Sequence, residues 1–167
     1  MDKGLMKLSK QLGKMLKEKN IKIATAESCT GGGIAQAITE VAGSSAWFDR
    51  GFVTYSNQAK VEMLHVHPAI LAASGAVSEE VAKQMVEGAL LNSNANLAVA
   101  VTGIAGPSGG SEQKPLGTVY IAWKYTKGDM NCIKQIFSGN RELVRQKTVH
   151  CAIKCCLGPF IETDSKL

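Results

Sequence analysis

The sequence predicts an α/β fold, specifically a three-layer α/β/α sandwich around a mixed, mostly parallel sheet. Helix-like and strand-like segments alternate along most of the chain, which favours helices packed on both faces of a sheet. The run Leu97–Val101 is apolar throughout, as is typical of a central strand buried on both faces. Around Ser28–Gly33, a short strand leads through a glycine-rich turn into a helix, an arrangement found at the ligand-binding edge of such sheets.

Composition and charge narrow the class of protein. The chain has 167 residues, of which 45% are hydrophobic and 20% charged, so we expect one domain over residues 1–167 with its core at about 5–157. We found neither an apolar run of membrane-spanning length nor a signal-peptide pattern, so we expect a cytoplasmic protein without membrane contact. The net charge of +5 comes without arginine–aromatic interleaving, which argues against nucleic-acid binding.

Each element in the N-terminal half has a local pattern. Residues 3–19 place leucines on one stripe opposite lysines, which predicts an amphipathic helix. Residues 21–24 are predicted to form a short strand. Residues 34–42 repeat apolar side chains at helical spacing, which predicts a helix. The segment 47–55 is rich in aromatic and β-branched residues and predicts a strand, which a short helix at about 58–64 follows.

The C-terminal half continues the alternation. After a second short helix ending near Ala73, Ser78 is expected to cap a helix that ends near residue 92. The buried strand 97–101 follows it. Segments 117–125 and 130–137 flank Lys127-Gly128-Asp129 and predict an antiparallel hairpin, and a final helix covers 141 to about 157.

Polar residues follow three of the predicted strands, and they suggest one site. Ser28 would be a nucleophile beside backbone N–H groups, although a serine before a helix is more commonly a simple cap. The chain offers no convincing Ser-His-Asp set, so Lys60 is the candidate base and Tyr55 a candidate proton relay. A solvated helix lysine is the alternative for Lys60. Cys29 is the rival nucleophile, or else small apolar filler.

Other residues could hold an anion. Arg141 and Arg145 lie four apart on one predicted helix, a spacing suited to a phosphate or carboxylate, or to a plain surface pair. The loop Thr102–Gly106 offers N–H groups and a hydroxyl, or is simply the connection after a buried strand. The five cysteines lack paired C-x-x-C spacing, so we expect packing roles and no metal site.

Six blocks follow one another along the chain: Ala26–Gly32, Val53–Asn57 with Lys60, Gly75–Ser78, Thr102–Pro107, Lys114–Val119, and Gly139–Arg141 with Arg145. Together these blocks resemble the CinA C-terminal-domain family, the nicotinamide-mononucleotide (NMN) amidohydrolases. The match covers about residues 5 to 157.

The resemblance implies hydrolysis of NMN to nicotinic acid mononucleotide and ammonia in pyridine-nucleotide salvage, without a metal or organic cofactor. It implies Ser28 as nucleophile, Lys60 as base and Tyr55 as a supporting group. It also implies an oxyanion turn and a ribose- and phosphate-binding set, made of Cys29, Thr30, Gly31, Gly32, Thr102, Gly103, Ala105, Gly106, Arg141 and Arg145. A homo-oligomer is expected on the same basis.

One departure from the family pattern leaves other functions open. The family often carries an aspartate after Gly-Pro, whereas this chain has Ser108 there. The alternatives are a non-catalytic nucleotide-binding protein that retains the pocket, and an interaction protein related to competence or DNA damage.

Overall fold

The structure, a computed structural model, describes residues 2–161 and contains a five-stranded mixed sheet in the order β2-β1-β3-β4-β5. Strands β2, β1 and β3 pair in parallel, while β4 is antiparallel to both β3 and β5. Four of the five strands therefore run in the same direction. The predicted fold class is confirmed, and so is the predicted hairpin, which is formed by β4 and β5.

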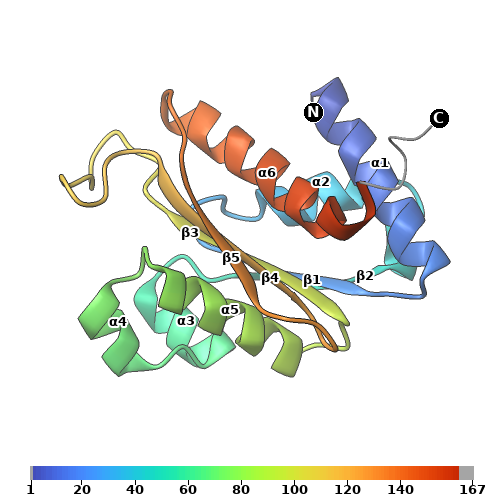
Figure 1. Ribbon diagram of the computed structural model, residues 1–167, viewed down its shortest axis with the longest axis horizontal. Helices are drawn as coiled ribbons and strands as arrows, with labels where there is room; N and C mark the ends of the chain where they lie inside the picture. Colours follow the sequence, from blue (N-terminus) through green and yellow to red (C-terminus); the bar gives the residue numbers. More distant parts are fainter. Residues whose placement is uncertain (1, 162–167) are drawn as a thin grey trace.

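Helices cover both faces of this sheet (Figure 1). One layer contains α1, α2 and α6, and the other contains α3, α4 and α5. The elements are α1 Lys3–Glu18, β1 Ile23–Glu27, α2 Gly33–Thr39, the 3-10 turn η1 Ser44–Ala46, β2 Phe48–Val53, α3 Asn57–Leu64, α4 Pro68–Ser74, α5 Glu79–Leu91, β3 Leu97–Gly103, β4 Thr118–Tyr125, β5 Asn131–Ile136 and α6 Arg141–Ile161.

The hydrophobic core consists of two clusters, one on each face of the sheet. Alternate residues of β3 supply both of them. Val99 and Val101 face the α1, α2 and α6 layer, whereas Ala98 and Ala100 face α5. This two-sided burial explains why residues 97–101 carry no polar side chain.

Strand β1 begins and ends later than its apolar pattern predicted. The sequence suggested residues 21–24, whereas the strand covers Ile23–Glu27 and pairs residue for residue with Leu97–Val101 of β3. The reason is its central position, because pairing on both sides extends the strand through Thr25 and Glu27 despite their polar side chains. Glu27 consequently belongs to the sheet rather than to the turn that follows.

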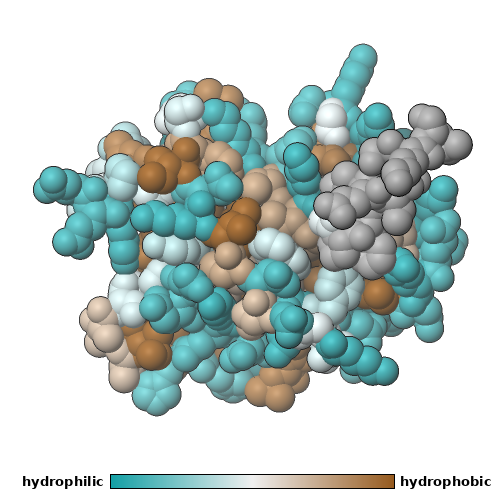
Figure 2. Space-filling view, viewed as in Figure 1, coloured by the Kyte–Doolittle hydropathy of each residue, from teal (hydrophilic) through white to brown (hydrophobic). Residues whose placement is uncertain are grey.

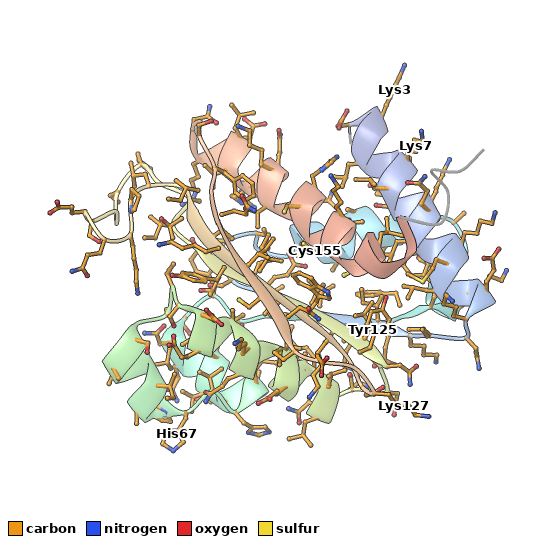
Figure 3. The ribbon with its side chains drawn as sticks, in the orientation of Figure 1. Lys3, Lys7, His67, Tyr125, Lys127 and Cys155 are labelled. Carbon is orange, nitrogen blue, oxygen red and sulfur yellow. The ribbon has the colours of Figure 1, made fainter. Side chains whose placement is uncertain are left out.

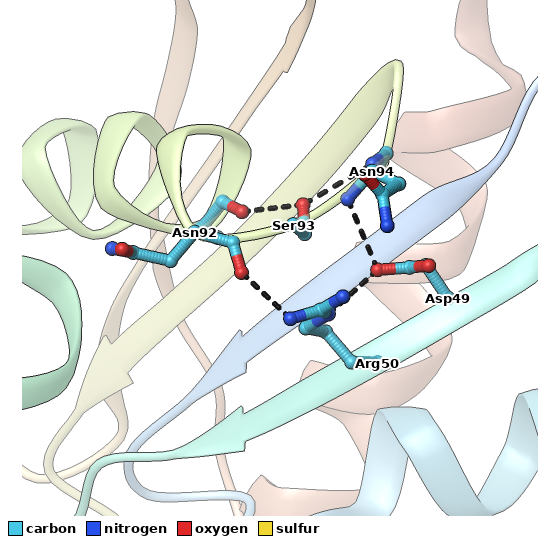
Figure 4. Close-up of polar contacts among 7 residues, drawn as sticks. Asp49, Arg50, Asn92, Ser93 and Asn94 are labelled. Carbon is cyan, nitrogen blue, oxygen red and sulfur yellow. Dashed lines mark hydrogen bonds and ion pairs between the residues drawn. The ribbon is translucent and has the colours of Figure 1, made fainter.

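The amino ends of the strands are tied together by polar contacts (Figure 4). Arg50 on β2 donates to the carbonyl of Asn92 at 3.0 Å, and Asp49 accepts the Asn94 N–H at 3.2 Å. Arg50 also pairs with Asp49 at 2.6 Å. These bonds attach the α5–β3 connection to the edge strand, at the end of the sheet opposite Ser28.

The outer surface is largely hydrophilic. In the space-filling view, apolar residues gather along the face where β5 crosses, between two more hydrophilic helical layers (Figure 2). Lys3 and Lys7 of α1 point away from the molecule, and so does His67 at the far end of the other layer (Figure 3). Within residues 2–161, none of the helices combines the length and the apolar character needed to cross a bilayer.

Helix α5 passes so close to the end of α3 that it requires a glycine. A Cβ atom at position 88 would lie 1.9 Å from the carbonyl oxygen of Leu64, so we expect Gly88→Ala to lower the free energy of unfolding by about 2 kcal/mol or more. Gly158→Ala in α6 is the matched control, because no atom lies within 4 Å of that Cβ. The control should gain up to about 1 kcal/mol from helix propensity. Urea unfolding of both variants measures the difference, and equal stabilities would contradict the predicted clash.

Candidate functional site

Ser28 directly follows the carboxyl end of β1. Its N–H donates to the carbonyl of Val101 on β3 at 3.1 Å, which fixes the residue against the centre of the sheet. The chain then turns through Gly31 and Gly32, whose φ angles of 60° and 95° favour glycine. Ser28 is only 8% exposed, so the turn holds it almost out of contact with solvent.

Lys60 is brought to Ser28 by helix α3. Ser56 caps this helix by accepting the Ala59 N–H at 3.0 Å, and Lys60 follows one turn later. The lysine is only 1% exposed, and its Nζ lies 3.0 Å from Ser28 Oγ. Nζ also donates to the carbonyls of Thr54 at 2.8 Å and Tyr55 at 3.4 Å. The structure thus brings together two side chains that lie 32 positions apart in the sequence.

The environment of Lys60 favours its neutral form. Burial lowers the pKa of Lys60 below its ordinary value of 10.5. Within the described part of the chain, no carboxylate forms an ion pair with this ammonium group. A neutral amine has two N–H donors for the two carbonyls and a lone pair that can accept from the Ser28 hydroxyl. This geometry suits a lysine that removes a proton from serine.

Glu27 lies under the turn as a fully buried carboxylate. One carboxylate oxygen accepts from the Thr30 hydroxyl at 2.6 Å and from the Ile34 N–H at 2.9 Å, and the other accepts from the Ala35 N–H at 2.8 Å. Sequence analysis missed this role. The strand was expected to end at residue 24, which left Glu27 outside it, so the one available signal was an acidic residue directly before Ser28.

The turn still has N–H groups that a ligand could use. The N–H groups of Gly31 and Gly33 donate to the carbonyls of Ser28 and Thr30. Among the hydrogen bonds found within residues 2–161, none uses the N–H groups of Thr30 or Gly32. These two donors are candidates for an oxyanion site beside Ser28.

Cys29 is a buried residue of the core. Its side chain is 6% exposed and packs in the core cluster on the α6 side. Burial raises the pKa of the Cys29 thiol to about 11, so the thiol is protonated at neutral pH and is a poor nucleophile.

Two arginines of α6 lie at the rim of the site. Arg145 donates to the carbonyl of Thr30 at 3.0 Å, and a Cβ on Gly31 would lie 3.5 Å from the same guanidinium. Arg141 donates to the carbonyl of Gly106 and to the hydroxyl of Tyr55, both at 2.8 Å. Of the ion pairs found within residues 2–161, none includes either arginine. The acceptors that hold these two guanidinium groups are neutral, so the positive charges are available to an anionic ligand.

The tyrosine hydroxyl lies on the rim rather than against the Ser28–Lys60 pair. Tyr55 is 60% exposed, and its hydroxyl accepts from Arg141, whereas its backbone carbonyl faces Lys60. Sequence analysis did not anticipate this contact, because Tyr55 and Arg141 are 86 positions apart and no local pattern links them.

The loop after β3 contributes mainly backbone. The Thr102 hydroxyl donates to the carbonyl of Ala76 at 2.8 Å, and Ala105 is buried in the core. A Cβ at Gly103 would lie 2.6 Å from Val119, so this position allows close contact with β4. Gly106, with a φ of 84°, directs its carbonyl to Arg141. A further cation that sequence analysis missed is Lys114, which donates to the carbonyl of Ser74 at 2.8 Å.

A large cavity lies next to this site. It has a volume of about 810 Å³, lies between α1, α2 and α6, and meets the site at Thr30, Gly33 and Arg145 without including Ser28 or Lys60. The hydrogen-bonded pair, rather than cavity size, therefore locates the chemistry. Within residues 2–161, no three His, Cys, Asp or Glu side chains lie together as metal ligands.

Comparisons with known proteins find relatives of this chain over nearly its whole length. A family model described as "CinA C-terminal domain" matches residues 5–158. The "Nicotinamide-nucleotide amidohydrolase PncC" of Escherichia coli (strain K12) is 48% identical over 161 residues, covering 96% of this chain and 98% of that protein. The protein of the same name from Pseudomonas putida is 51% identical over 149 residues, covering 87% and 91%. The crystal structure of "competence/damage inducible protein CihA" from Agrobacterium tumefaciens has a TM-score of 0.93 at 45% identity, covering 95% and 96%.

Proposed function

The chain belongs to the CinA C-terminal domain family, and on that premise we propose that it hydrolyses the carboxamide of NMN, giving nicotinic acid mononucleotide and ammonia. The observation that carries the proposal is the buried contact of 3.0 Å between Lys60 Nζ and Ser28 Oγ, with no ion-paired carboxylate on the lysine within residues 2–161. The E. coli and P. putida relatives are named nicotinamide-nucleotide amidohydrolases, which supports hydrolysis of an amide and a nicotinamide nucleotide as the substrate.

In the proposed first half-reaction, Lys60 removes the Ser28 proton as the serine oxygen attacks the carboxamide carbon. The resulting oxyanion would accept hydrogen bonds from the N–H groups of the turn at Thr30 and Gly32. Lys60 then donates its proton to the departing amide nitrogen, which leaves as ammonia. The product is an ester between Ser28 and the nicotinoyl group.

In the second half-reaction, a water molecule occupies the position that ammonia has left, beside the ester carbon. Neutral Lys60 removes a proton from the water, hydroxide adds to the ester carbon, and the proton returns to Ser28 as nicotinic acid mononucleotide leaves. Arg141 and Arg145, which have no carboxylate partner within residues 2–161, would hold the phosphate of the nucleotide. We place this reaction in pyridine-nucleotide salvage in the cytoplasm, and propose that the chain acts as a homo-oligomer.

The test is ammonia release from NMN by the purified protein, with nicotinamide riboside as a matched substrate that lacks the phosphate. We expect ammonia from both and a KM at least about tenfold higher for the riboside, because it loses a charge-assisted contact with the arginines. Binding of NMN without ammonia release would instead support a non-catalytic nucleotide-binding protein. A protein that neither binds NMN nor releases ammonia would contradict both functions.

We expect Cys29→Ala to keep ammonia release within about threefold of wild type. The buried, protonated thiol has no part in the proposed reaction, and the variant retains the backbone N–H at this position. Loss of the packed sulfur should lower the free energy of unfolding by about 1 kcal/mol. Activity assays and urea unfolding measure the two effects. A loss of activity comparable to that of a serine variant would assign the nucleophile to Cys29.

A further inference from the structure

The proposed reaction assigns no role to Glu27, which lies next to Ser28. Of the acidic residues described between positions 2 and 161, it is the one that is buried, with no exposed surface. It also directly precedes Ser28. A buried carboxylate is retained only where it is well paired, so its contacts indicate what it does.

Its three hydrogen bonds span the whole turn. They reach Thr30 in the middle of the turn, and Ile34 and Ala35 in the first turn of α2. All three partners are donors, so the carboxylate form accepts each bond. Gly32, the residue at the start of α2, has no side chain that could cap the helix. Glu27 therefore supplies the cap from the strand and ties both ends of the turn to each other.

This arrangement also determines where a substrate anion can bind. The first N–H groups of a helix are a common phosphate site, but those of Ile34 and Ala35 already donate to Glu27. The phosphate must then find its partners elsewhere, and the two arginines at the rim are available.

Glu27 could alternatively act as the counterion of Lys60, and the contacts argue against that role. Lys60 Nζ bonds to Ser28, Thr54 and Tyr55, whereas both oxygens of Glu27 are turned toward α2. The negative charge lies against the positive end of the helix, where backbone donors stabilise it. The lysine is therefore left without the partner that would keep it protonated.

We propose that Glu27 is a positioning residue that holds the Ser28 turn in its reactive geometry, an inference that rests on the proposed function of Ser28 as nucleophile. The carboxylate fixes the turn from the side of α2, while Arg145 holds the Thr30 carbonyl from the side of α6. Ser28 is then held at the distance from Lys60 that proton transfer requires.

The test is the rate constant for labelling of Ser28 by a fluorophosphonate, a probe that reacts with activated serines and does not require NMN. In Glu27→Gln, the amide donates where the carboxylate accepted, so its NH₂ group opposes at least one of the α2 N–H groups. We expect the rate constant to fall on the order of tenfold to a hundredfold. Thr30→Val removes one of the three bonds and should have a smaller effect. Glu40→Gln, an exposed acid at the other end of α2, is the matched control and should label like wild type.

Several outcomes separate positioning from mere stabilisation. A rate constant, unlike the amount labelled, is not lowered by a fraction of the variant that is permanently misfolded. The pH midpoint of labelling should stay unchanged in Glu27→Gln, and kcat for NMN should fall while KM stays the same. An unchanged rate constant in both Glu27→Gln and Thr30→Val would overturn the proposal, as would a shifted pH midpoint, which would make Glu27 an electrostatic partner of Lys60.

The labelling assay also distinguishes failure of this inference from failure of the proposed function. If wild type labels at Ser28 but releases no ammonia from NMN, the substrate is wrong, and the comparison of Glu27→Gln with wild type still decides the role of Glu27. If wild type does not label at Ser28, the serine is not activated and the positioning role is overturned with it.

Discussion

Ser28→Ala is expected to lower ammonia release from NMN by at least about a thousandfold. In enzymes that form a covalent intermediate, removal of the nucleophile abolishes the covalent route and leaves only the contribution of binding and oxyanion contacts. The substitution should leave the fold intact, because Ser28 is nearly buried and alanine fits in its place. Lys60 would keep its bonds to the carbonyls of Thr54 and Tyr55.

The measurement compares kcat for the variant with NMN binding by equilibrium dialysis. Ser9→Ala is a matched control, because Ser9 is also buried, lies in α1 away from the site, and its Oγ has no hydrogen-bond partner in the structure. It should retain both activity and stability. If Ser28→Ala binds NMN and keeps more than about a tenth of the activity, Ser28 is not the nucleophile, and either Cys29 or a water molecule activated directly must take that role.

The layers and the hairpin follow from signals that a sequence carries locally, whereas the order of the strands in the sheet was not predicted. The uninterrupted apolar run at 97–101 indicates a strand that is buried on both faces. The short segment around Lys127-Gly128 predicts the turn of a hairpin. The order of the polar residues that end the strands was sufficient to place Ser28 and Lys60 at the same edge of the sheet. Burial and pairing within short stretches are therefore predictable.

Contacts between distant segments are not predictable in the same way. Nothing in the residues around Glu27 indicates that its carboxylate bonds to Ile34 and Ala35, because that depends on how the glycine turn folds back. The contact between Arg141 and Tyr55 depends on where α6 crosses the sheet. The boundaries of β1 were also wrong for this reason, since pairing with β2 and β3 rather than local composition determines where a central strand ends.

Lys60→Met is the second change with a large expected effect, a loss of at least about a hundredfold in ammonia release at neutral pH. Methionine fills a similar volume but cannot remove the Ser28 proton, and general-base catalysis is typically worth this much or more. Lys60→Arg keeps a positive charge at this position but removes the group that could act as a base. A guanidinium stays protonated in proteins, so this variant should also be inactive if Lys60 acts as a base. Substantial activity in Lys60→Arg would show that only a positive charge is needed.

The pH dependence of the wild-type protein tests the same assignment, because in the proposed reaction the neutral amine of Lys60 is the reactive form. Ammonia release should rise with pH through the lowered pKa of Lys60 and then level off below its ordinary value of 10.5. Stability should change in the same direction. Between the lowered pKa and 10.5 the unfolded chain holds a proton on Lys60 that the folded chain does not, so the free energy of unfolding rises with pH. Lys60→Met lacks this group, so it should lose that part of the rise, and the stability difference between wild type and variant should shift in favour of wild type toward pH 10. Urea unfolding of both proteins across this range measures the difference, and parallel stability curves would mean that burial does not perturb Lys60.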